Sequence, residues 1–292
     1  MITVIGTITY DVVIYPDMRK FESLGGILYN IIALANLTDE TIIPVANVGK
    51  SMYTQLTAML SKYHNIKLNG LNIIKQRHPV SFLFMFSEYG TQYDEGQISP
   101  ILFKQVKPFL NSSFILANFT SGYDINLRTL KMIRKEATCP IYLDYHCLSL
   151  GRDKLGNRYL KRVTNWNKWV SLANFVQFNK IEAQVISGKE IRTKEDALSF
   201  GKTILKEGPK TVIITLGREG SFIIYLDKKN KVKHEHIPSV NVPYVISTVG
   251  CGDFYSAGFL HYYLKYHNNL TAARLASQVA SKRCTMKNIN EF

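Results

Sequence analysis

Residues 175–215 read FVQFNKIEAQVISGKEIRTKEDALSFGKTILKEGPKTVIIT, and they decide the fold class. The run FVQF at Phe175–Phe178 and the run VIIT at Val212–Thr215 are short, apolar and rich in β-branched or aromatic residues. Such runs indicate strands that are buried on both faces, as in a parallel sheet covered by helices. Residues 194–206, between them, have a helical pattern. The segment therefore predicts a parallel βαβ unit.

The same alternation of short apolar runs and longer amphipathic stretches continues over most of the chain. It predicts a three-layer α/β/α sandwich with a mostly parallel central sheet, and such sheets bind ligands at the carboxyl ends of their strands. The expected strands are Ile2–Ile5, Ile42–Val48, Phe82–Phe86, Phe114–Asn118, Ile141–Leu143, Phe175–Phe178 and Val212–Thr215. The expected helices are Ile27–Asn36, Ser51–Tyr63, Leu127–Lys135, Lys194–Lys206, Phe254–Tyr266 and Thr271–Arg283.

Two segments interrupt this alternation. Residues 12–24 show no helical pattern, and residues 69–100 are β-rich with no helix between their apolar runs. We expect a small antiparallel sheet outside the main one, acting as a lid; an ordinary edge hairpin is the alternative. The prediction is one domain over residues 1–292 with lid segments at about 12–24 and 69–100.

The composition is that of a globular protein with a basic excess. Of 292 residues, 46% are hydrophobic and 20% are charged, which excludes disorder over the whole chain. Lys and Arg number 36 against 22 Asp and Glu, a net charge of +14 that suggests polyanionic partners. The most basic stretch, residues 151–170, includes Trp166 and Trp169 but no nucleic-acid-binding motif. We expect a solvated loop anchored by its tryptophans, or one that raises the positive potential for a phosphate-bearing ligand at the carboxyl ends of the strands.

Other classes of protein are disfavoured by what the sequence lacks. No run of about 18 apolar residues occurs, so a spanning helix is not expected. The first residues lack the basic start and long apolar run of a signal peptide. The cysteines form no C-x-x-C pair, which fits a reducing compartment. We therefore expect a cytoplasmic protein without nucleic-acid or membrane partners. The cysteines are Cys139, Cys147, Cys251 and Cys284.

The strongest chemical signal is STVGCGDFYSAGF at Ser247–Phe259. A Gly-x-Gly turn (Gly250–Gly252) opens directly into an amphipathic helix, and glycines let backbone N–H groups face a ligand at the positive end of the helix dipole. Asp253 sits at the mouth of this anion cradle. A carboxylate there suits a base that takes a proton from a hydroxyl attacking phosphorus. A plain helix N-cap is the equally weighted alternative.

Three weaker motifs accompany it. Asn179 and Glu182 follow the FVQF strand and would share one face of a first helical turn, where such a pair can order a hydrated Mg²⁺ through water; a helix cap is the favoured alternative when they are taken alone. TLGREG at residues 215–220 forms a tight turn that suits either a nucleotide or a hairpin. GGILYN at residues 25–30 permits close backbone approach to a ligand, or simply starts a helix.

In this order, the motifs resemble the PfkB-type (ribokinase-like) carbohydrate kinase family. The resemblance spans Ile2 to about Cys284 and begins with a Gly-x-x-x-x-Asp at Gly6–Asp11. It implies that Asp253 is the catalytic base and that the amides of Val249, Gly250, Cys251 and Gly252 form the anion hole. It implies sugar contacts at Asp11, Gly25, Gly26 and Asn30, a nucleotide wall at Thr215, Gly217 and Gly220, and ordering of Mg²⁺ and phosphate by Asn179 and Glu182.

The chain also departs from that family. Ser247 stands where the signature usually has an Asp that helps to build a monovalent-cation site, which weakens the case for potassium activation. Residues 49–51 read GKS where the family has a Gly-Asp-Asp-like stretch. Pro44 excludes a Walker P-loop there, and a solvated Lys50 is expected. Asp144 resembles a substrate-pocket residue of the family, whereas His146, two residues on, is expected to be a satisfied loop histidine.

The sequence therefore predicts an ATP- and Mg²⁺-dependent phosphotransferase that acts on a hydroxyl of a small sugar or sugar-like molecule. One alternative is a nucleoside kinase of the same fold. Another is a catalytically silent sensor that binds a nucleotide or sugar, which Ser247 and the missing Asp pair motivate. The expected state is a monomer or a homodimer formed through the lid.

Overall fold

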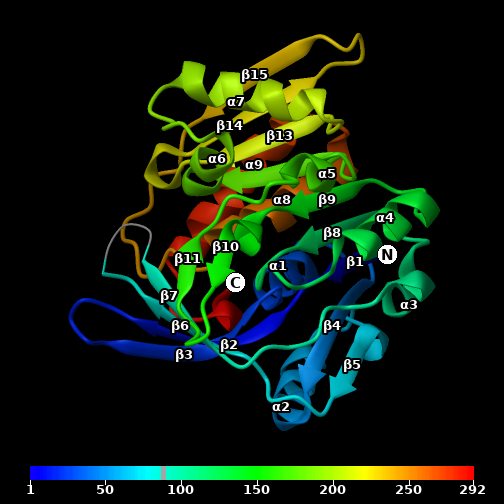
Figure 1. Cartoon of the computed structure of the whole chain (residues 1–292), viewed down its shortest axis with the longest axis vertical. Helices are drawn as coiled ribbons and strands as arrows, with labels where there is room; N and C mark the ends of the chain where they lie inside the picture. The colour runs from blue at the N-terminus through cyan, green and yellow to red at the C-terminus, as the bar shows by residue number, and fades with distance from the viewer. Residues whose placement is uncertain (87–89) are drawn as a thin grey trace.

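The computed structural model of the chain describes residues 1–86 and 90–292, so residues 87–89 of the expected lid segment lie outside the described residues. A nine-stranded sheet in the order β15-β14-β13-β12-β9-β8-β1-β4-β5 forms its centre (Figure 1). Neighbouring strands run parallel from β5 to β13, and β14 and β15 are antiparallel additions. The strands are β1 (Ile2–Ile5), β4 (Ile42–Gly49), β5 (Leu71–Ile74), β8 (Phe114–Asn118), β9 (Ile141–Asp144), β12 (Phe175–Asn179), β13 (Thr211–Thr215), β14 (Ser221–Leu226) and β15 (Val232–Ile237).

Helices cover both faces of this sheet, because successive strand residues point to opposite sides and each side is apolar. Ile2 and Val4 of β1 join one hydrophobic cluster and Ile5 joins the other. The first cluster is covered by α1 (Leu28–Leu37), α2 (Lys50–Leu60), α8 (Cys251–Tyr266) and α9 (Asn269–Cys284). The second is covered by α3 (Phe103–Val106), α4 (Leu127–Glu136), α5 (Trp166–Val170), α6 (Lys180–Ser187) and α7 (Lys194–Lys206). The predicted three-layer sandwich with a mostly parallel sheet is confirmed.

A second, four-stranded sheet projects beside the main one in the order β3-β2-β6-β7 (Figure 1). Its strands are β2 (Ile8–Ile14), β3 (Lys20–Gly26), β6 (Val80–Phe84) and β7 (Thr91–Glu95). A hairpin of β10 (Leu150–Arg152) and β11 (Arg158–Leu160) lies against it, with an isolated bridge between Tyr93 and Asn157. We call the four strands the small sheet and the hairpin the arginine hairpin.

The small sheet differs from the expectation in two respects. The β5 strand, within residues 69–100, joins the main sheet beside β4 instead of standing outside it. It does so because α2 carries the chain back from β4, as in an ordinary parallel crossover. The two hairpins of the small sheet are also joined by parallel pairing of β2 with β6, so the sheet is mixed and not purely antiparallel.

Most predicted helices and strands agree with the observed ones to within three residues at each end. Lys194–Lys206 and Phe114–Asn118 coincide with α7 and β8. Trp169 is buried and packs edge-on against Phe119, so the expected tryptophan anchor is confirmed. Lys50 is exposed at the start of α2, also as expected. The 3₁₀ turns are η1 (Leu68–Gly70), η2 (Lys107–Phe109), η3 (His146–Ser149), η4 (Gly217–Glu219) and η5 (Ile289–Glu291).

A helix that crosses a membrane must be both long and apolar. Among the residues that the structure describes, no helix has both the length and the apolar character needed to cross a membrane.

Phe175 lies at the centre of the aromatic packing between the sheet and α8. Its ring centroid lies 5.5 Å from that of Phe114, 5.6 Å from that of Phe259 and 4.7 Å from that of Tyr263. The side chain is buried, so truncation would leave a cavity that this ring cluster cannot easily fill.

We therefore expect Phe175→Ala to lower the free energy of unfolding by about 3–5 kcal/mol, measured by urea denaturation. The control is Tyr244→Ala, since Tyr244 is 59% exposed and its truncation should change stability by less than about 0.5 kcal/mol. Equal effects of the two substitutions would contradict this assignment of the core.

Candidate active site

The loop at residues 247–250 and the first turn of α8 form the predicted anion cradle. Gly250 is the N-cap residue, with φ 83°, and no side chain caps the helix. A Cβ at Gly250 would come within 2.5 Å of the Tyr29 ring, so both the left-handed backbone and the tight packing require glycine. The N–H of Cys251 donates to the backbone oxygen of Thr248 at 3.2 Å. No side chain caps the rest of the first turn, which leaves the N–H of Gly252 available to an anion. Asp253 lies inside the helix and is not its N-cap, so the plain-cap alternative is wrong.

Asp253 is buried and held from two sides. Asn118, at the end of β8, donates from Nδ2 to Oδ1 of Asp253 at 2.6 Å. Asn30, on α1, donates from Nδ2 to the backbone oxygen of Asp253 at 2.9 Å. Burial raises the pKa of Asp253, while His146 and the bond from Asn118 oppose that rise. The carboxyl group therefore has one fixed orientation and a basicity above that of an exposed aspartate.

The resemblance implied that Asn30 contacts the sugar, but its side chain lies in the protein interior. It is fully buried, and Nδ2 also donates to Oγ of Ser256 at 2.9 Å. Its Oδ1 accepts from Asn118 at 2.9 Å, so the amide already has protein partners on both sides. Asn118 itself was missed by the sequence analysis. Its place at the carboxyl end of a parallel strand was the one available signal.

Asp11, on β2, lies at the acceptor side of the site. Oδ1 accepts from Oγ1 of Thr9 at 2.6 Å, and the side chain is 4% exposed. A Cβ on Gly25 would overlap the carboxylate, so Gly25 makes room for Asp11 on the neighbouring strand. Gly26 turns the chain into α1 with φ 63°. Burial raises the pKa of Asp11 to about 7, and the charge of Asp253 adds to the rise.

Asp144 and His146 lie beneath the anion cradle. Gln177 donates from Nε2 to Oδ2 of Asp144 at 3.0 Å and to the backbone oxygen of Gly252 at 3.1 Å, so it joins β9, β12 and α8. Burial raises the pKa of Asp144 well above its usual range. Burial disfavours the charged form of His146, yet Cys147, Asp253 and Asp144 raise its pKa well above the ordinary value. The expectation of a satisfied histidine is confirmed only in part: His146 bonds to Cys147, whereas its Nδ1 is buried without a partner among the described residues.

Asn179 and Glu182 form a complete capping box at the start of α6. Glu182 accepts from the backbone N–H of Asn179 at 2.9 Å and from its Nδ2 at 2.5 Å, and Asn179 Oδ1 accepts from the N–H of Glu182 at 2.9 Å. Burial raises the pKa of Glu182 to about 7. Each carboxylate oxygen keeps acceptor capacity, which suits a water ligand of a hydrated Mg²⁺. In the described ranges, no group of three or more His, Cys, Asp or Glu gathers to bind a metal directly.

The predicted nucleotide turn lies beside that capping box. Thr215 is the parallel-register partner of Asn179, so η4 follows directly from the neighbouring strand. Oγ1 of Thr215 donates to the backbone oxygen of Phe178 at 3.4 Å. Gly217 has φ 59° and open space where a side chain would be, and Gly220 has φ 91° at the start of β14. The turn is thus the hairpin between β13 and β14, and its role as a nucleotide wall stays a prediction.

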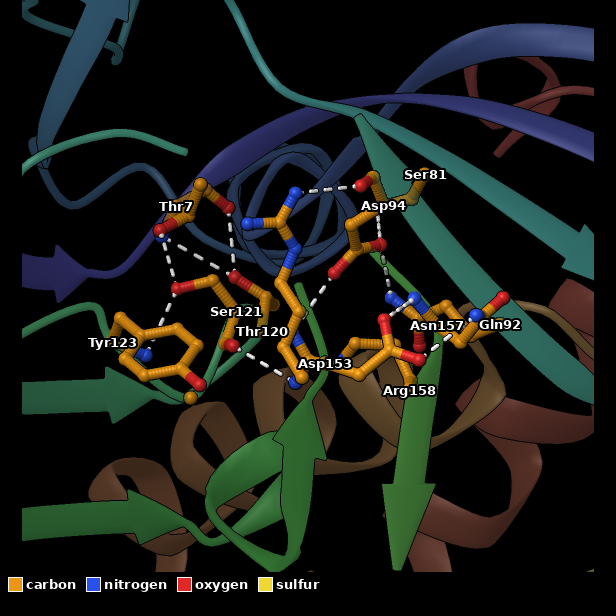
Figure 2. A network of polar contacts seen from close by, with 12 residues as sticks. Thr7, Ser81, Gln92, Asp94, Thr120, Ser121, Tyr123, Asp153, Asn157 and Arg158 are labelled. Atoms are coloured by element: carbon orange, nitrogen blue, oxygen red, sulfur yellow. Dashed lines mark hydrogen bonds and ion pairs between the residues drawn. The ribbon is translucent and has the colours of Figure 1, made fainter. Parts of the chain in front are cut away.

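A small cavity lies between the small sheet, the end of β8 and the arginine hairpin, where Figure 2 shows the polar contacts of Arg158. Thr9, whose hydroxyl donates to Asp11, is one of the lining residues. Arg158, only 2% exposed at its side chain, donates to Oδ2 of Asp94 at 2.8 Å and to the backbone oxygen of Ser121 at 2.9 Å. Arg152 donates to the backbone oxygen of Asp94 at 2.8 Å. Arg152 and Arg158 are therefore not solvated, whereas the other basic residues of the stretch are exposed as expected, namely Lys154, Lys161, Arg162 and Lys168. Hydroxyl groups line much of the cavity, namely those of Thr7, Thr9, Ser81, Thr120 and Ser121.

An uncapped glycine-started helix facing buried carboxylates, at the carboxyl ends of a mostly parallel sheet with a small second sheet beside them, defines a ribokinase-like fold. Residues 147–291 match the family model described as pfkB family carbohydrate kinase. This half of the chain is therefore similar to the pfkB family of carbohydrate kinases.

The curated relatives with a named activity are also kinases. A ribokinase of Staphylococcus aureus (strain COL) is 31% identical over 107 residues, 37% of this chain and 33% of that protein. A nucleoside kinase of Methanothermobacter thermautotrophicus is 42% identical over 74 residues, 25% of this chain and 22% of that protein. These matches span about a third or less of the curated relatives. The structure of an Arabidopsis thaliana ribokinase complexed with ribose and ATP superposes with a TM-score of 0.75 at 17% identity, covering 100% of this chain and 95% of that one, which shows the fold.

The raised pKa of Asp11 makes a prediction about stability. The folded chain holds a proton on Asp11 up to about pH 7, whereas an unfolded aspartate releases it near pH 4. The stabilising effect of that proton is complete below about pH 4 and is lost as the pH rises to about 7 and above.

Asp11→Asn removes this titration, so we expect its free energy of unfolding to fall less than that of wild type between pH 5 and pH 8. The difference should be roughly 2–4 kcal/mol, because one unit of pKa shift corresponds to about 1.4 kcal/mol. Urea denaturation at both pH values measures it, with the exposed Asp39→Asn as control. A pH dependence unchanged in Asp11→Asn would contradict the burial of this charge.

Proposed function

We propose that this chain is an ATP-dependent kinase that phosphorylates a hydroxyl group of a small sugar or sugar-like molecule. The observation that carries the proposal is the position of Asp253. Its carboxyl group is buried in the first turn of an uncapped helix and oriented by Asn118, where a hydroxyl and a phosphoryl group can meet.

The chemistry is an in-line displacement. Asp253 takes the proton of the acceptor hydroxyl, the acceptor oxygen bonds to the γ-phosphorus, and the bond from that phosphorus to the β–γ bridging oxygen breaks, releasing ADP. The amides of Gly250, Cys251 and Gly252 stabilise the charge on the transferred group. The raised pKa of Asp253 suits a general base, because efficiency improves as the pKa approaches the working pH. Bound Mg²⁺ would offset phosphate charge, with Asn179 and Glu182 ordering its water ligands.

The acceptor molecule and the phosphate donor, ATP, would bind to different elements of the fold. Asp11 and the hydroxyl-lined cavity beside it provide acceptors and donors suited to a polyol, with Arg158 and Asp94 at the far side. The turn at Thr215, Gly217 and Gly220 would hold the nucleotide next to Asn179. The small sheet, with residues 12–24 and 69–100, would act as the lid of a single 1–292 domain. Asp144 would orient the turn below the anion hole through Gln177 instead of contacting the acceptor.

The oligomeric state follows from the edges of the small sheet. The β7 edge is covered by the arginine hairpin, whereas β3 is the other edge strand. We propose that the chain is either a monomer or a homodimer in which two β3 strands pair, since an open edge is a template for another strand.

Two other functions fit parts of the site. A nucleoside kinase is favoured by the Methanothermobacter relative, which carries that name. A silent sensor is motivated by Ser247 and by Lys50 and Ser51 in place of an acidic pair. An assay of ADP release over a panel of sugars, sugar phosphates and nucleosides separates them. Turnover of a sugar supports the proposal. Turnover of nucleosides alone would show that the acceptor is a nucleoside and not a sugar. Ligand binding without turnover across the panel supports the sensor.

We expect Asp253→Asn to lower kcat by about 10²–10⁴-fold, because the acceptor hydroxyl loses its base. The affinity for ATP, measured by calorimetry, should stay within about three-fold of wild type, since the amides of the anion hole are retained. Asp227→Asn, in an exposed turn on the far side of the sheet, is the matched control and should retain full activity. Near-wild-type turnover by Asp253→Asn would refute the base assignment.

We expect Arg158→Met to raise the KM for the acceptor by about ten-fold or more and to leave the KM for ATP unchanged. The substitution leaves the Asp94 carboxylate, 10% exposed, without its cation and detaches the arginine hairpin from β7. Arg158→Lys should restore only part of the lost acceptor affinity, because Arg158 uses two nitrogen atoms to donate to two different acceptors.

Arg128→Met removes an exposed arginine and serves as the control for charge. Thermal denaturation of each variant shows that the chain remains folded. An increase in the KM for ATP with an unchanged KM for the acceptor would contradict the acceptor assignment of this cavity.

A further inference from the structure

Arg283 is a buried cation next to the anion cradle. It lies in the last turn of α9 and is 3% exposed. Nη1 donates to the backbone oxygen of Met286 at 3.0 Å, and Nε has no partner among the described residues. The guanidinium carbon lies 5.4 Å from the centre of the Tyr29 ring and 6.0 Å from that of Phe254. Within residues 1–86 and 90–292, no carboxylate forms an ion pair with it. The hydroxyl of Tyr29 also bonds to Arg283, and the positive charge of Arg283 lowers the pKa of the buried Asp253 without a direct ion pair. A buried cation that has no carboxylate at ion-pair distance is costly, so its retention favours an anionic ligand nearby.

Three contacts place Arg283 behind the anion hole. The Tyr29 ring that it faces also packs against Gly250. Phe254, the second ring, follows Asp253 directly in α8. The backbone oxygen of Cys284 accepts from the N–H groups of Ile246 at 2.8 Å and Ser247 at 3.3 Å, which ties the cradle loop to the end of α9.

A small cavity separates Arg283 from that loop. Its lining includes Ser23, Ser247, Val249 and Lys287 as well as Arg283, so two cations and no carboxylate face it. Ser247 contributes only a hydroxyl, and its Oγ already accepts from the N–H of Val249 at 3.2 Å. Such a lining is poor at holding a metal cation, for which carboxylate or carbonyl oxygens are needed. It is instead a region of positive potential produced by the chain itself.

We propose that Arg283 is a positioning residue that supplies a permanent positive charge behind the anion hole, so that phosphoryl transfer in this chain requires no monovalent cation. The inference rests on the proposed kinase function. The charge adds to the dipole of α8 at the amides of Gly250–Gly252, where the γ-phosphoryl group would lie. A neutral Ser247 completes the arrangement, because an acid at this position would pair with Arg283 and cancel its charge.

The first test uses the wild-type chain and the acceptor found in the panel. Turnover is compared with K⁺ or tetramethylammonium as the sole monovalent cation at equal ionic strength. We expect rates that agree within about two-fold, since the charge is covalently part of the chain. Activation by K⁺ beyond two-fold would overturn the proposal. This test needs no variant and so does not depend on how substitutions fold.

The second test removes the charge. In tetramethylammonium, Arg283→Met should lower kcat by about ten-fold or more, and it should weaken the affinity for ATP more than that for ADP, because only ATP places a γ-phosphoryl group in the anion hole. Arg283→Lys should recover most of both effects. The control Lys282→Met removes an exposed lysine from the same helical turn and should behave as wild type. Unchanged kcat in Arg283→Met, or equal losses of ATP and ADP affinity, would overturn the proposal.

The affinities also separate this inference from the proposed function. If no acceptor in the panel is phosphorylated, the kinase proposal fails, while calorimetric titration of the same variants with ATP and ADP still tests Arg283. A selective loss of ATP affinity in Arg283→Met, reversed in Arg283→Lys, would support the charge; an unchanged preference for ATP would refute it.

Discussion

The burial of carboxyl groups at the carboxyl ends of the central strands constrains the rest of this structure. Asp11, Asp144, Glu182 and Asp253 are all buried there, and burial raises the pKa of each. Acids so placed repel one another when ionised, so the fold must orient each one and supply positive potential nearby. A mostly parallel sheet meets this need, because neighbouring strands end at one edge and helix N-termini face the same side.

The backbone around these acids is adapted to them. Gly25 leaves room for the Asp11 carboxylate on the adjacent strand, and Gly250 lets α8 begin against the Tyr29 ring. Asn118 and Asn30, from β8 and α1, then hold the turn that carries Asp253. Apart from the contact between Gly25 and Asp11 within one hairpin, these constraints join segments that are far apart in sequence.

The net charge of +14 has a different meaning once the chain is folded. Most basic residues are exposed, but two arginines are inside. Arg158 is paired with Asp94 and binds the small sheet to the main one, so its charge is largely compensated. Arg283 instead lies against two aromatic rings and donates to one backbone carbonyl, without a carboxylate at ion-pair distance among the described residues. The two positions show why a count of charges predicts an attraction for anions but not where that attraction acts.

The sequence by itself determined the sandwich, most of its elements and the positions of Asp253, Asn179 and the glycine turns, because these depend on periodicity and local spacing. Only the tertiary structure decided that Asn118 orients Asp253, that β5 joins the main sheet, and that the arginine hairpin closes a cavity beside Asp11. The reason is physical. A helix or strand pattern is set by neighbouring residues. The partner of a buried group is set by packing between segments that are 25 to 135 residues apart in these examples, and the pattern of a single sequence does not show which segments pack together.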